Sequence, residues 1–346
     1  MNRLSRREFL KVTAAGAGAV AMSQFVNPFP AQAVGKCLWG AFPDPFPGCE
    51  TDPDGCGPED YMPKVREFEA LIGRTIGMTR HYPRWDYPIP NPVIRESRRT
   101  GHIPLISWRP ELLSGQWLNW IDIANGVHDA RVDEVATKMA QWNRSAYFVF
   151  HHEPENAFRH AHCGTQAEFA LAYDHIRQRF ELAAQQLGRV SKLTWVCTLQ
   201  RVTYDGSNGG ANQWFPDGAD IVGVDGYNRG SCSGDKTWKT FESLFTSGRD
   251  FAVARGMNMM LEEWGCVEND PSDCGVSGIT DTKANWISTA GSILRTWPVK
   301  AVIYTHSLAE FKTLPVDFRV NTLAPGETNS SALAAYKAVG ALPFFN

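Results

Sequence analysis

The sequence has little of several features that mark particular classes of protein. Its net formal charge is only -3 over 346 residues, so charge gives no reason to expect nucleic acid or an anionic membrane as a partner. Beyond residue 33 no apolar run is long enough to span a bilayer. No linker, repeat or low-complexity tract divides this part of the chain either. The sequence therefore predicts one sizeable globular domain.

Cysteines with CxxC spacing are also absent, which argues against a cysteine zinc site. The eight cysteines are an even number, and disulfides are the expected state of cysteines in an exported protein. Cys49/Cys56 and Cys266/Cys274 are close enough in sequence to close small loops, and Cys163/Cys232 is possible if their loops meet. We predict disulfides on this basis.

The N-terminal segment has the pattern of an export signal. Ser5–Lys11 contains paired arginines, an Ala/Gly-rich apolar segment follows, and Ala31-Gln32-Ala33 provides a cleavage site. This pattern resembles a twin-arginine signal. It predicts removal of residues 1–33, a mature chain of residues 34–346, and a secreted or periplasmic location with no membrane attachment after cleavage.

Short apolar segments alternate with longer amphipathic ones along the mature chain. Asp129–Trp142, Thr165–Leu187 and Lys283–Thr296 have helical spacing, and Gly188 stands where a helix should stop. Eight segments read as strands covered on both faces: Cys37–Phe42, Thr75–Tyr82, Ile103–Trp108, Ala146–His151, Leu193–Leu199, Ile221–Tyr227, Met257–Glu262 and Val299–Thr305. Strands alternating with helices predict an α/β fold, a (β/α)8 TIM barrel in a single domain. An open doubly wound sheet is the alternative, but no glycine-rich fingerprint follows the first strand.

Polar residues collect where the predicted strands end. In a (β/α)8 barrel these ends form one rim, where catalytic groups sit. The polar strand ends are Ser107–Pro110, His151–Asn156, Asp225–Asn228, Glu262–Gly265 and Thr305–Ser307. Carboxylates on separate strands could flank a glycosidic bond, one as nucleophile and the other as acid and then base. The 12 tryptophans would suit a groove for flat hydroxylated ligands.

Four segments of the sequence carry a resemblance to clan A glycoside hydrolases, and within that clan to family 26, the β-mannanase family. His152-Glu153-Pro154 is similar to the family's His-Glu motif at strand four. Glu262–Gly265 is similar to its nucleophile motif at strand seven. Trp214–Pro216 and Asp220–Tyr227 are similar to its strand-six block. The segment Pro154–Asn156 departs from the Met-Asn that usually follows His-Glu.

The resemblance implies roles for individual residues. Glu153 would be the general acid/base and Glu263, which directly precedes Trp264-Gly265, the nucleophile. Glu262 competes for that role, and adjacent strand residues are expected to point to opposite faces. Tyr227 would donate a hydrogen bond to the nucleophile, and His152 would line the sugar site. The other expected substrate contacts are Trp264, Trp108, Trp214 and Asn156.

The resulting hypothesis is a secreted, monomeric, retaining glycoside hydrolase that acts on a polysaccharide. An endo-β-1,4-mannanase is the leading interpretation, and a β-glucanase or β-xylanase is the alternative with the same chemistry. No cofactor and no metal are expected, since water and two carboxylates suffice. Two rival classes remain: a metal-dependent barrel hydrolase using His160 and His162, whose i,i+2 spacing could chelate a metal, and a non-catalytic carbohydrate-binding barrel.

Overall fold

The structure is a computed structural model that describes residues 36–43, 58–156, 162–230, 237–268, 281–311 and 314–345. These residues fall within one compact unit, Val34–Asn346. The predicted export signal lies outside the described residues. So do four of the eight cysteines, Cys49, Cys56, Cys232 and Cys274.

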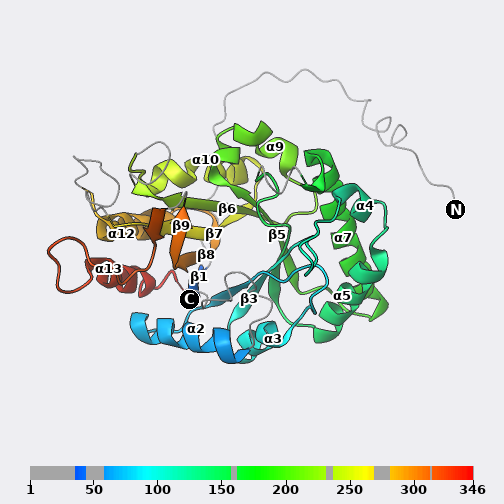
Figure 1. Cartoon of the computed structure of the whole chain (residues 1–346), viewed down its shortest axis with the longest axis horizontal. Helices are drawn as coiled ribbons and strands as arrows, with labels where there is room; N and C mark the ends of the chain where they lie inside the picture. Colours follow the sequence, from blue (N-terminus) through cyan, green and yellow to red (C-terminus); the bar gives the residue numbers. More distant parts are fainter. Residues whose placement is uncertain are drawn as a thin grey trace, which may run out of the picture. The chain divides into compact units, whose positions relative to one another are not determined.

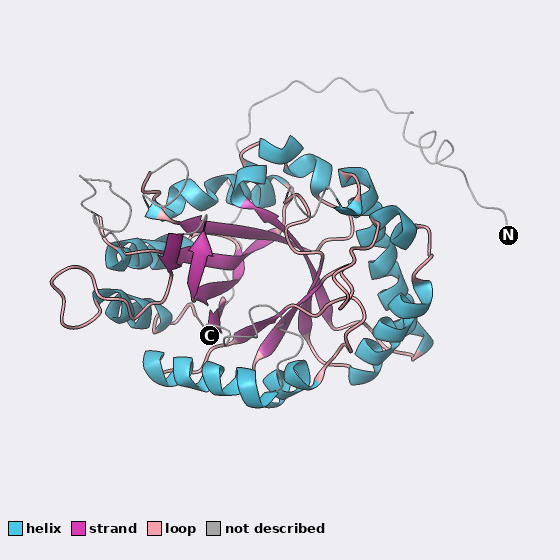
Figure 2. Ribbon diagram, in the orientation of Figure 1, coloured by secondary structure: helices cyan, strands magenta, loops and turns pink. Residues whose placement is uncertain are grey.

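Eight parallel strands close into a barrel in sequential order, each paired with the next and β8 paired with β1 (Figures 1 and 2). The strands are β1 (Leu38–Pro43), β2 (Met78–His81), β3 (Ile103–Trp108), β4 (Ala146–Phe150), β5 (Leu193–Gln200), β6 (Ile221–Asn228), β7 (Asn258–Cys266) and β8 (Val299–His306). The predicted (β/α)8 barrel is confirmed, and all eight predicted strands are present. The alternative of an open sheet is wrong, because Leu38 pairs with Ala301 and so joins the first strand to the last.

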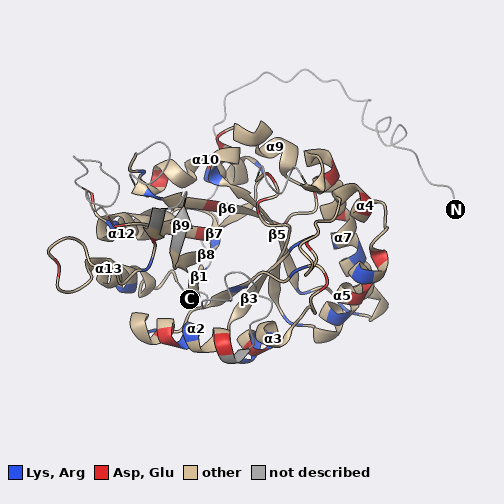
Figure 3. Cartoon of the chain, viewed as in Figure 1, with Lys and Arg blue, Asp and Glu red and all other residues tan. Residues whose placement is uncertain are grey.

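Helices surround the barrel, as the ring of helices outside the strands shows in Figure 2. They are α2 (Pro58–Ile72), α3 (Pro92–Arg99), α4 (Trp120–Ala124), α5 (Asp129–Trp142), α7 (Gln166–Gln186), α8 (Arg201–Tyr204), the 3-10 turn η1 (Ser207–Gly209), α9 (Ala211–Trp214), α10 (Phe241–Ala254), α12 (Lys283–Leu294) and α13 (Ser331–Gly340). A short hairpin of β9 (Leu308–Phe311) and β10 (Leu314–Asp317) follows β8. Charged positions lie mainly along the outer helices, with isolated exceptions on the strands (Figure 3). No helix among the described residues is long and apolar enough to cross a membrane.

The three predicted helices form where their sequence patterns place them. Helix α5 occupies the predicted range, and its buried side chains recur at helical spacing: Val132, Val135, Ala136 and Met139. The N-cap of α7 is Thr165, which forms a reciprocal capping box with Glu168. Two residues after α7 ends, Gly188 has a φ of 64°, the left-handed conformation that glycine adopts most easily.

Apolar side chains fill the lower half of the barrel, nearer the amino ends of the strands. They form one cluster to which seven of the eight strands contribute buried residues: Met78, Leu105, Val149, Val196, Ile221, Met260, Ala301 and Ile303. This layer closes the barrel interior below the carboxyl ends of the strands. We call this cluster the apolar floor, and the polar groups at the carboxyl ends of the strands lie above it.

Candidate active site

The polar side chains of the site occupy the inward-facing positions above that apolar floor. Side chains on one face of a strand recur every two residues. On β2, Arg80 follows Met78 at this spacing, and on β5, Gln200 follows Thr198 and Val196. Asp225 follows the floor residue Ile221 on β6 by two such steps. The change from apolar to polar residues along these strands therefore builds a polar layer on top of the core.

The segment after β4 turns sharply and brings His152 and Glu153 over the barrel. His151 and Glu153 have φ values of 53° and 47°, in the left-handed region that residues other than glycine rarely adopt. Neighbouring strands hold this turn: the His151 amide donates to the Trp108 carbonyl at 3.0 Å, and the Glu153 amide donates to the Thr198 carbonyl at 3.2 Å. Tertiary hydrogen bonds thus stabilise a backbone that local preferences disfavour.

A β-bulge on β7 places both of its glutamates near the same arginine. Leu261 pairs with Val224 and Glu263 pairs with Asp225, so Glu262 is the extra residue. Arg80 Nη2 lies 3.4 Å from Glu262 Oε2 and 3.3 Å from Glu263 Oε1. The expectation that the two side chains point to opposite faces is therefore wrong. Their exposure differs: the Glu262 side chain is wholly buried, whereas that of Glu263 is 19% exposed.

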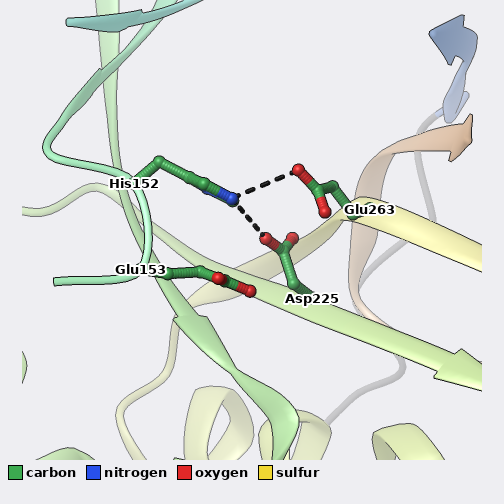
Figure 4. Close-up of side chains that lie close together, drawn as sticks. All are labelled: His152, Glu153, Asp225 and Glu263. Carbon is green, nitrogen blue, oxygen red and sulfur yellow. Dashed lines mark ion pairs between the residues drawn. The ribbon is translucent and has the colours of Figure 1, made fainter. Parts of the chain in front are cut away.

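Four side chains converge at the centre of the rim: His152, Glu153, Asp225 and Glu263 (Figure 4). One nitrogen or carboxylate oxygen from each lies within 4.8 Å of those of the other three. His152 Nε2 lies 3.1 Å from Asp225 Oδ2 and 3.2 Å from Glu263 Oε1. The predicted acid/base and the predicted nucleophile therefore stand next to each other, with His152 and Asp225 beside them.

Two tyrosine hydroxyls hold the two oxygens of Glu263. Tyr82 donates to Oε1 and Tyr227 to Oε2, both at 2.6 Å. The hydrogen bond predicted for Tyr227 is thus present. Burial raises the pKa of both tyrosines well above 10, so both hydroxyls keep their protons and remain donors.

The hydrogen bonds of His152 fix its tautomer. Arg80 Nη2 lies 2.9 Å from His152 Nδ1, and an arginine can only donate. Nδ1 therefore accepts, and Nε2 carries the proton that faces Asp225 and Glu263. His152 thus donates to Glu263, whereas neither Asp225 oxygen has a hydrogen-bond partner among the described residues.

The carboxylates of the site have opposite pKa shifts because Arg80 is the main cation among them. Burial by itself would raise the pKa of Glu263, but Arg80 and then His152 and Tyr227 hold it well below its usual value. Burial, and next the charge on Glu263, raises the pKa of Asp225 well above its usual value. Burial likewise raises the pKa of Glu262. Of these three carboxylates, Glu263 is therefore the one that stays ionised.

Glu153 is held by Gln200, at the end of β5. The Gln200 side chain donates through Nε2 to Glu153 Oε2 at 3.0 Å, and the backbone N–H of Gln200 donates to Glu155 Oε1. Glu155 is buried and also accepts from Thr203 Oγ1 at 3.1 Å. Burial, and then the charge on Glu153, raises the pKa of Glu155 to about 8. Gln200 thus links the half-exposed glutamate at the rim to a buried one below it.

The cluster of His152, Glu153, Asp225 and Glu263 has enough donor atoms to be considered as a metal site. Its hydrogen bonding does not suit that role. With Nδ1 facing a guanidinium and Nε2 protonated, His152 offers no lone pair to a metal. Arg80 already supplies a positive charge 3.3 Å from Glu263. The arrangement fits carboxylate chemistry better than metal ligation.

Of the histidines near the end of β4, only His152 belongs to the cluster found among the described residues. Trp120 Nε1 donates to His151 Nδ1 at 2.9 Å, and the His151 ring stacks on Trp117. His151 is buried among these aromatic rings and is not part of the site. His162 is exposed, and His160 lies outside the described residues.

The three tryptophans expected to stack on sugars lie in the hydrophobic core. Trp108 and Trp214 belong to one buried cluster and Trp264 to another, each with at most 1% of its surface exposed. Trp108 stacks on Trp85 at 4.1 Å, and Trp264 packs against Trp39 and other rings. Their burial argues against the stacking role, because no indole face is left for a ligand.

Asn156 and the described cysteines complete the comparison with the sequence. Asn156 is half-buried. Its backbone N–H donates to the Glu153 carbonyl at 3.1 Å, so it helps close the turn that carries Glu153. The prediction of a Cys266/Cys274 disulfide is wrong: Cys266 is a buried thiol in contact with Asn228 and Val267. No disulfide joins any two of the cysteines in the described ranges, and the partners proposed for the others lie outside those ranges.

Sequence reasoning missed Arg80 and Tyr82 as members of the site. Both come from β2 or the residue just after it, and both contact Glu263. The signal was present: Met78, Arg80 and Tyr82 alternate along the strand and change from apolar to polar towards its carboxyl end. Gln200 was also missed, although Val196, Thr198 and Gln200 show the same alternation and the same change from apolar to polar along β5.

The fold and the cluster together define a (β/α)8 barrel with a carboxylate-rich centre at the carboxyl ends of its strands. In fold, the chain is similar to solved structures of glycoside hydrolase family 26 mannanases. The modular endo-β-1,4-mannanase of Cellulomonas fimi has a TM-score of 0.55 at 14% identity, over 90% of this chain and 72% of that one. The catalytic domain of a Bacillus sp. JAMB-750 endo-β-1,4-mannanase has a TM-score of 0.56 at 14% identity, over 90% and 87%.

A third similar structure is a β-mannanase of Bacteroides ovatus, with a TM-score of 0.53 at 12% identity over 91% of each chain. The family resemblance seen in the sequence motifs thus extends to the fold of nearly the whole chain. Neither the models of protein families nor the curated proteins gave a match.

Proposed function

We propose that the protein is a retaining β-glycoside hydrolase of the family 26 type, with β-1,4-mannan as its substrate. The observation that carries this proposal is the spacing of its two central glutamates, whose nearest oxygens lie within 4.8 Å of each other. Retaining glycosidases keep their carboxyl groups about 5–5.5 Å apart, and inverting ones about 6.5–9.5 Å, to leave room for a water. The similarity in fold to family 26 mannanases supports the substrate class.

Glu263 is suited to the role of nucleophile. It is ionised, because Arg80 and the donors around it hold its pKa well below the usual value. Tyr82 and Tyr227 fix the direction of its two oxygens. In the first step a Glu263 oxygen forms a bond to the anomeric carbon as the bond to the leaving oxygen breaks.

Glu153 is suited to the role of acid and then base. It is half-buried at the rim, and Gln200 orients one of its oxygens. In the first step it gives its proton to the leaving oxygen. In the second step it takes a proton from water, whose oxygen attacks the anomeric carbon and releases Glu263. Both glutamates return to their starting states, so no cofactor is consumed.

Other β-glycans fit the same mechanism, because the two glutamates act on the anomeric centre whichever sugar is bound. We favour β-1,4-mannan as the substrate, because the sequence motifs resemble those of mannanases and the similar solved structures are mannanases. Mixed-linkage β-glucan and β-xylan are the substrates to test beside it. Export by a twin-arginine signal would bring the enzyme to such polymers outside the cytoplasm, and it remains part of this proposal.

Release of reducing sugar from galactomannan, glucomannan, mixed-linkage glucan and β-xylan tests the proposal. The wild type would be compared with Glu153→Ala, Glu263→Ala and the control Glu242→Ala, which changes an exposed glutamate on α10. We expect one polymer to be cleaved, by the wild type and the control only. Cleavage that survives Glu263→Ala, or that EDTA abolishes, would contradict the two-glutamate mechanism.

The stereochemistry of the product tests retention separately. Proton NMR at early times of hydrolysis distinguishes the anomers before they interconvert in water. A retaining enzyme releases the β-anomer first from a β-linked polymer. Initial release of the α-anomer would mean inversion, and would require a different role for Glu263.

A further inference from the structure

A cavity opens to solvent beside the predicted acid/base, with an empty volume of about 560 Å³. It lies between the ends of β5 and β6. Its wall includes three cationic residues, Arg201, Arg229 and Lys239. Four residues of the site also line it: Glu153, Gln200, Asp225 and Tyr227. Glu263 is not among the described residues that line it. The cavity therefore adjoins the acid/base rather than the nucleophile.

Arg201 is built into one side of this cavity. It is the first residue of α8, directly after β5. Its side chain packs beside Gly226: its Cδ would lie 3.4 Å, an ordinary van der Waals distance, from a Cβ placed on that glycine. Its Nη1 lies 3.5 Å from Asp205 Oδ2, and its side chain is 21% exposed. The guanidinium is thus positioned by the barrel wall and still reaches solvent.

Arg229 forms a second side, immediately after β6. Its Cζ lies 5.2 Å from the centre of the Tyr227 ring, the tyrosine that donates to Glu263. The arginine is half-buried, and burial lowers its pKa. A cation in such a partly dry place interacts more strongly with an anion than one in bulk water.

Lys239 closes the cavity from a segment that hydrogen bonds hold in place. Its amide donates to Asn228 Oδ1 at 3.1 Å, and its carbonyl accepts from Trp286 Nε1 at 2.9 Å. Asp225, which also lines the cavity, has a pKa raised well above its usual value by burial. Three cationic residues therefore line the cavity together with Glu153.

We propose that this cavity is a subsite for a sugar that carries an anionic group, a uronate carboxylate or a sulfate ester, on the leaving-group side of the scissile bond. The inference rests on the proposed function, because it takes Glu153 as the residue that protonates the leaving oxygen. The leaving sugar must then lie next to Glu153 and away from Glu263, which is where the cavity is.

The chemistry of the wall favours an anionic group over a neutral sugar. The fork of an arginine matches the paired oxygens of a carboxylate or a sulfate, and such hydrogen bonds are roughly twice as strong as those between neutral groups. Neutral sugars are more often held by amides, hydroxyls and aromatic faces. Two arginines and a lysine beside the proposed acid thus favour a sugar that carries a negative charge.

Binding to matched polymers tests the inference without turnover. The probes are oligosaccharides of neutral galactomannan, the same oligosaccharides oxidised at C6 to uronates, and the same oligosaccharides sulfated. Isothermal titration calorimetry with the Glu263→Ala variant gives their affinities. We expect one anionic probe to bind about tenfold more tightly than the neutral one at low salt. The preferred probe identifies the anion as a carboxylate or a sulfate.

Arginine variants locate the preference within the cavity. In the Glu263→Ala background, Arg201→Gln and Arg229→Gln should each remove most of the preference and change the affinity for the neutral probe less than about twofold. Arg295→Gln is the matched control, because it removes an exposed arginine just after α12, at the opposite end of the barrel. Equal affinity for all three probes, or a preference that both cavity variants keep, would overturn the inference.

Salt dependence provides a readout that needs no folded arginine variant. Between about 0.05 M and about 0.5 M NaCl the preference should fall, because salt screens partly exposed charges. A preference that does not change with salt would contradict an ionic origin. Hydrolysis of neutral mannan without any anionic preference would refute only this inference. An anionic preference without hydrolysis of any β-glycan would refute the proposed enzyme activity and the leaving-group assignment, and would leave the cavity as a binding site for anionic sugars.

Discussion

The hydroxyl of Tyr82 lies 2.6 Å from Oε1 of Glu263 and donates to it. The two residues are 181 positions apart in sequence: Tyr82 directly follows β2, and Glu263 lies on β7. With Tyr227 on the other oxygen, the carboxylate is held at both ends. This arrangement keeps Glu263 charged and aimed, and it makes a specific prediction for the pH dependence of activity.

Tyr82→Phe should lower kcat/KM for the cleaved polymer by about ten- to a hundredfold. The variant loses one hydrogen bond to a charged group, which is worth about 1.5–3 kcal/mol. Loss of this donor also raises the pKa of Glu263, which is now held well below its usual value. The acidic limb of the pH–rate profile should therefore move to higher pH. Initial rates from about pH 3 to pH 8 measure both effects.

The control for this experiment is Tyr147→Phe, which changes a half-buried tyrosine in the first part of β4, packed against the apolar floor. It should leave the acidic limb unchanged. An unshifted acidic limb in Tyr82→Phe would mean that this hydroxyl does not stabilise the charge on Glu263.

Arg80→Met should destabilise the fold by about 3–5 kcal/mol at neutral pH, because it leaves buried carboxylates without their cation. Arg80 contacts both Glu262 and Glu263 and accordingly carries the main positive charge in the site. In the variant the folded-state pKa of both glutamates rises, so their protonation relieves the penalty. The stability difference from wild type should therefore shrink as the pH falls towards 4.

Urea unfolding of both proteins at several pH values measures this difference. Arg295→Met, which replaces an exposed arginine, should stay close to wild type throughout. A loss of stability in Arg80→Met that is the same at every pH would point to lost packing rather than to lost charge compensation.

Glu155→Gln should make stability less sensitive to alkaline pH. Burial raises the pKa of Glu155 to about 8 in the folded protein, so the folded state binds this proton more tightly than the unfolded state does. The stabilisation that this proton provides is present at low pH and is lost as the pH rises through the folded-state value. Relative to wild type, the variant should gain about 4 kcal/mol of stability between pH 5 and pH 9, because wild type loses about 1.4 kcal/mol for each pH unit between pH 5 and the folded-state value.

Chemical denaturation at those two pH values measures the gain in Glu155→Gln. Glu242→Gln, at an exposed position, should show no such gain. A variant that loses the same stability at both pH values would mean that Glu155 is already ionised in the folded protein.

Cys266 should react with iodoacetamide only when the protein is unfolded, and it should do so without any reductant. Its side chain is buried, and burial raises the pKa of the thiol well above its usual value, which suppresses the reactive thiolate. Peptide mapping by mass spectrometry before and after denaturation measures the modification. A requirement for reductant would indicate a disulfide at this position.

The barrel could be predicted because parallel strands buried on both faces are near-continuously apolar, and that pattern needs no partner to be visible. The ends of β4, β6 and β7 were predicted for the same reason, since each apolar run stops at polar residues. Glu153, Glu263, His152 and Tyr227 were found in this way, and the structure brings all four together.

The rest depends on contacts between strands that one sequence does not reveal. The bulge at Glu262 arises from the register between β6 and β7, so strict alternation along one strand could not predict it. Arg80 and Tyr82 join the site because β2 lies where their side chains can reach Glu263. Trp108 and Trp264 were assigned to the rim although they fill the layer between barrel and helices, where an indole buries a large apolar area.

The turn at the end of β4 has a consequence for protein engineering. Its left-handed residues His151 and Glu153 are held by carbonyls of Trp108 and Thr198, on the strands to either side. A peptide with this sequence would relax to another conformation, and so would the same loop grafted onto a barrel with a different β3 or β5. A redesign that transfers this turn to another barrel would therefore have to transfer β3, β4 and β5 together.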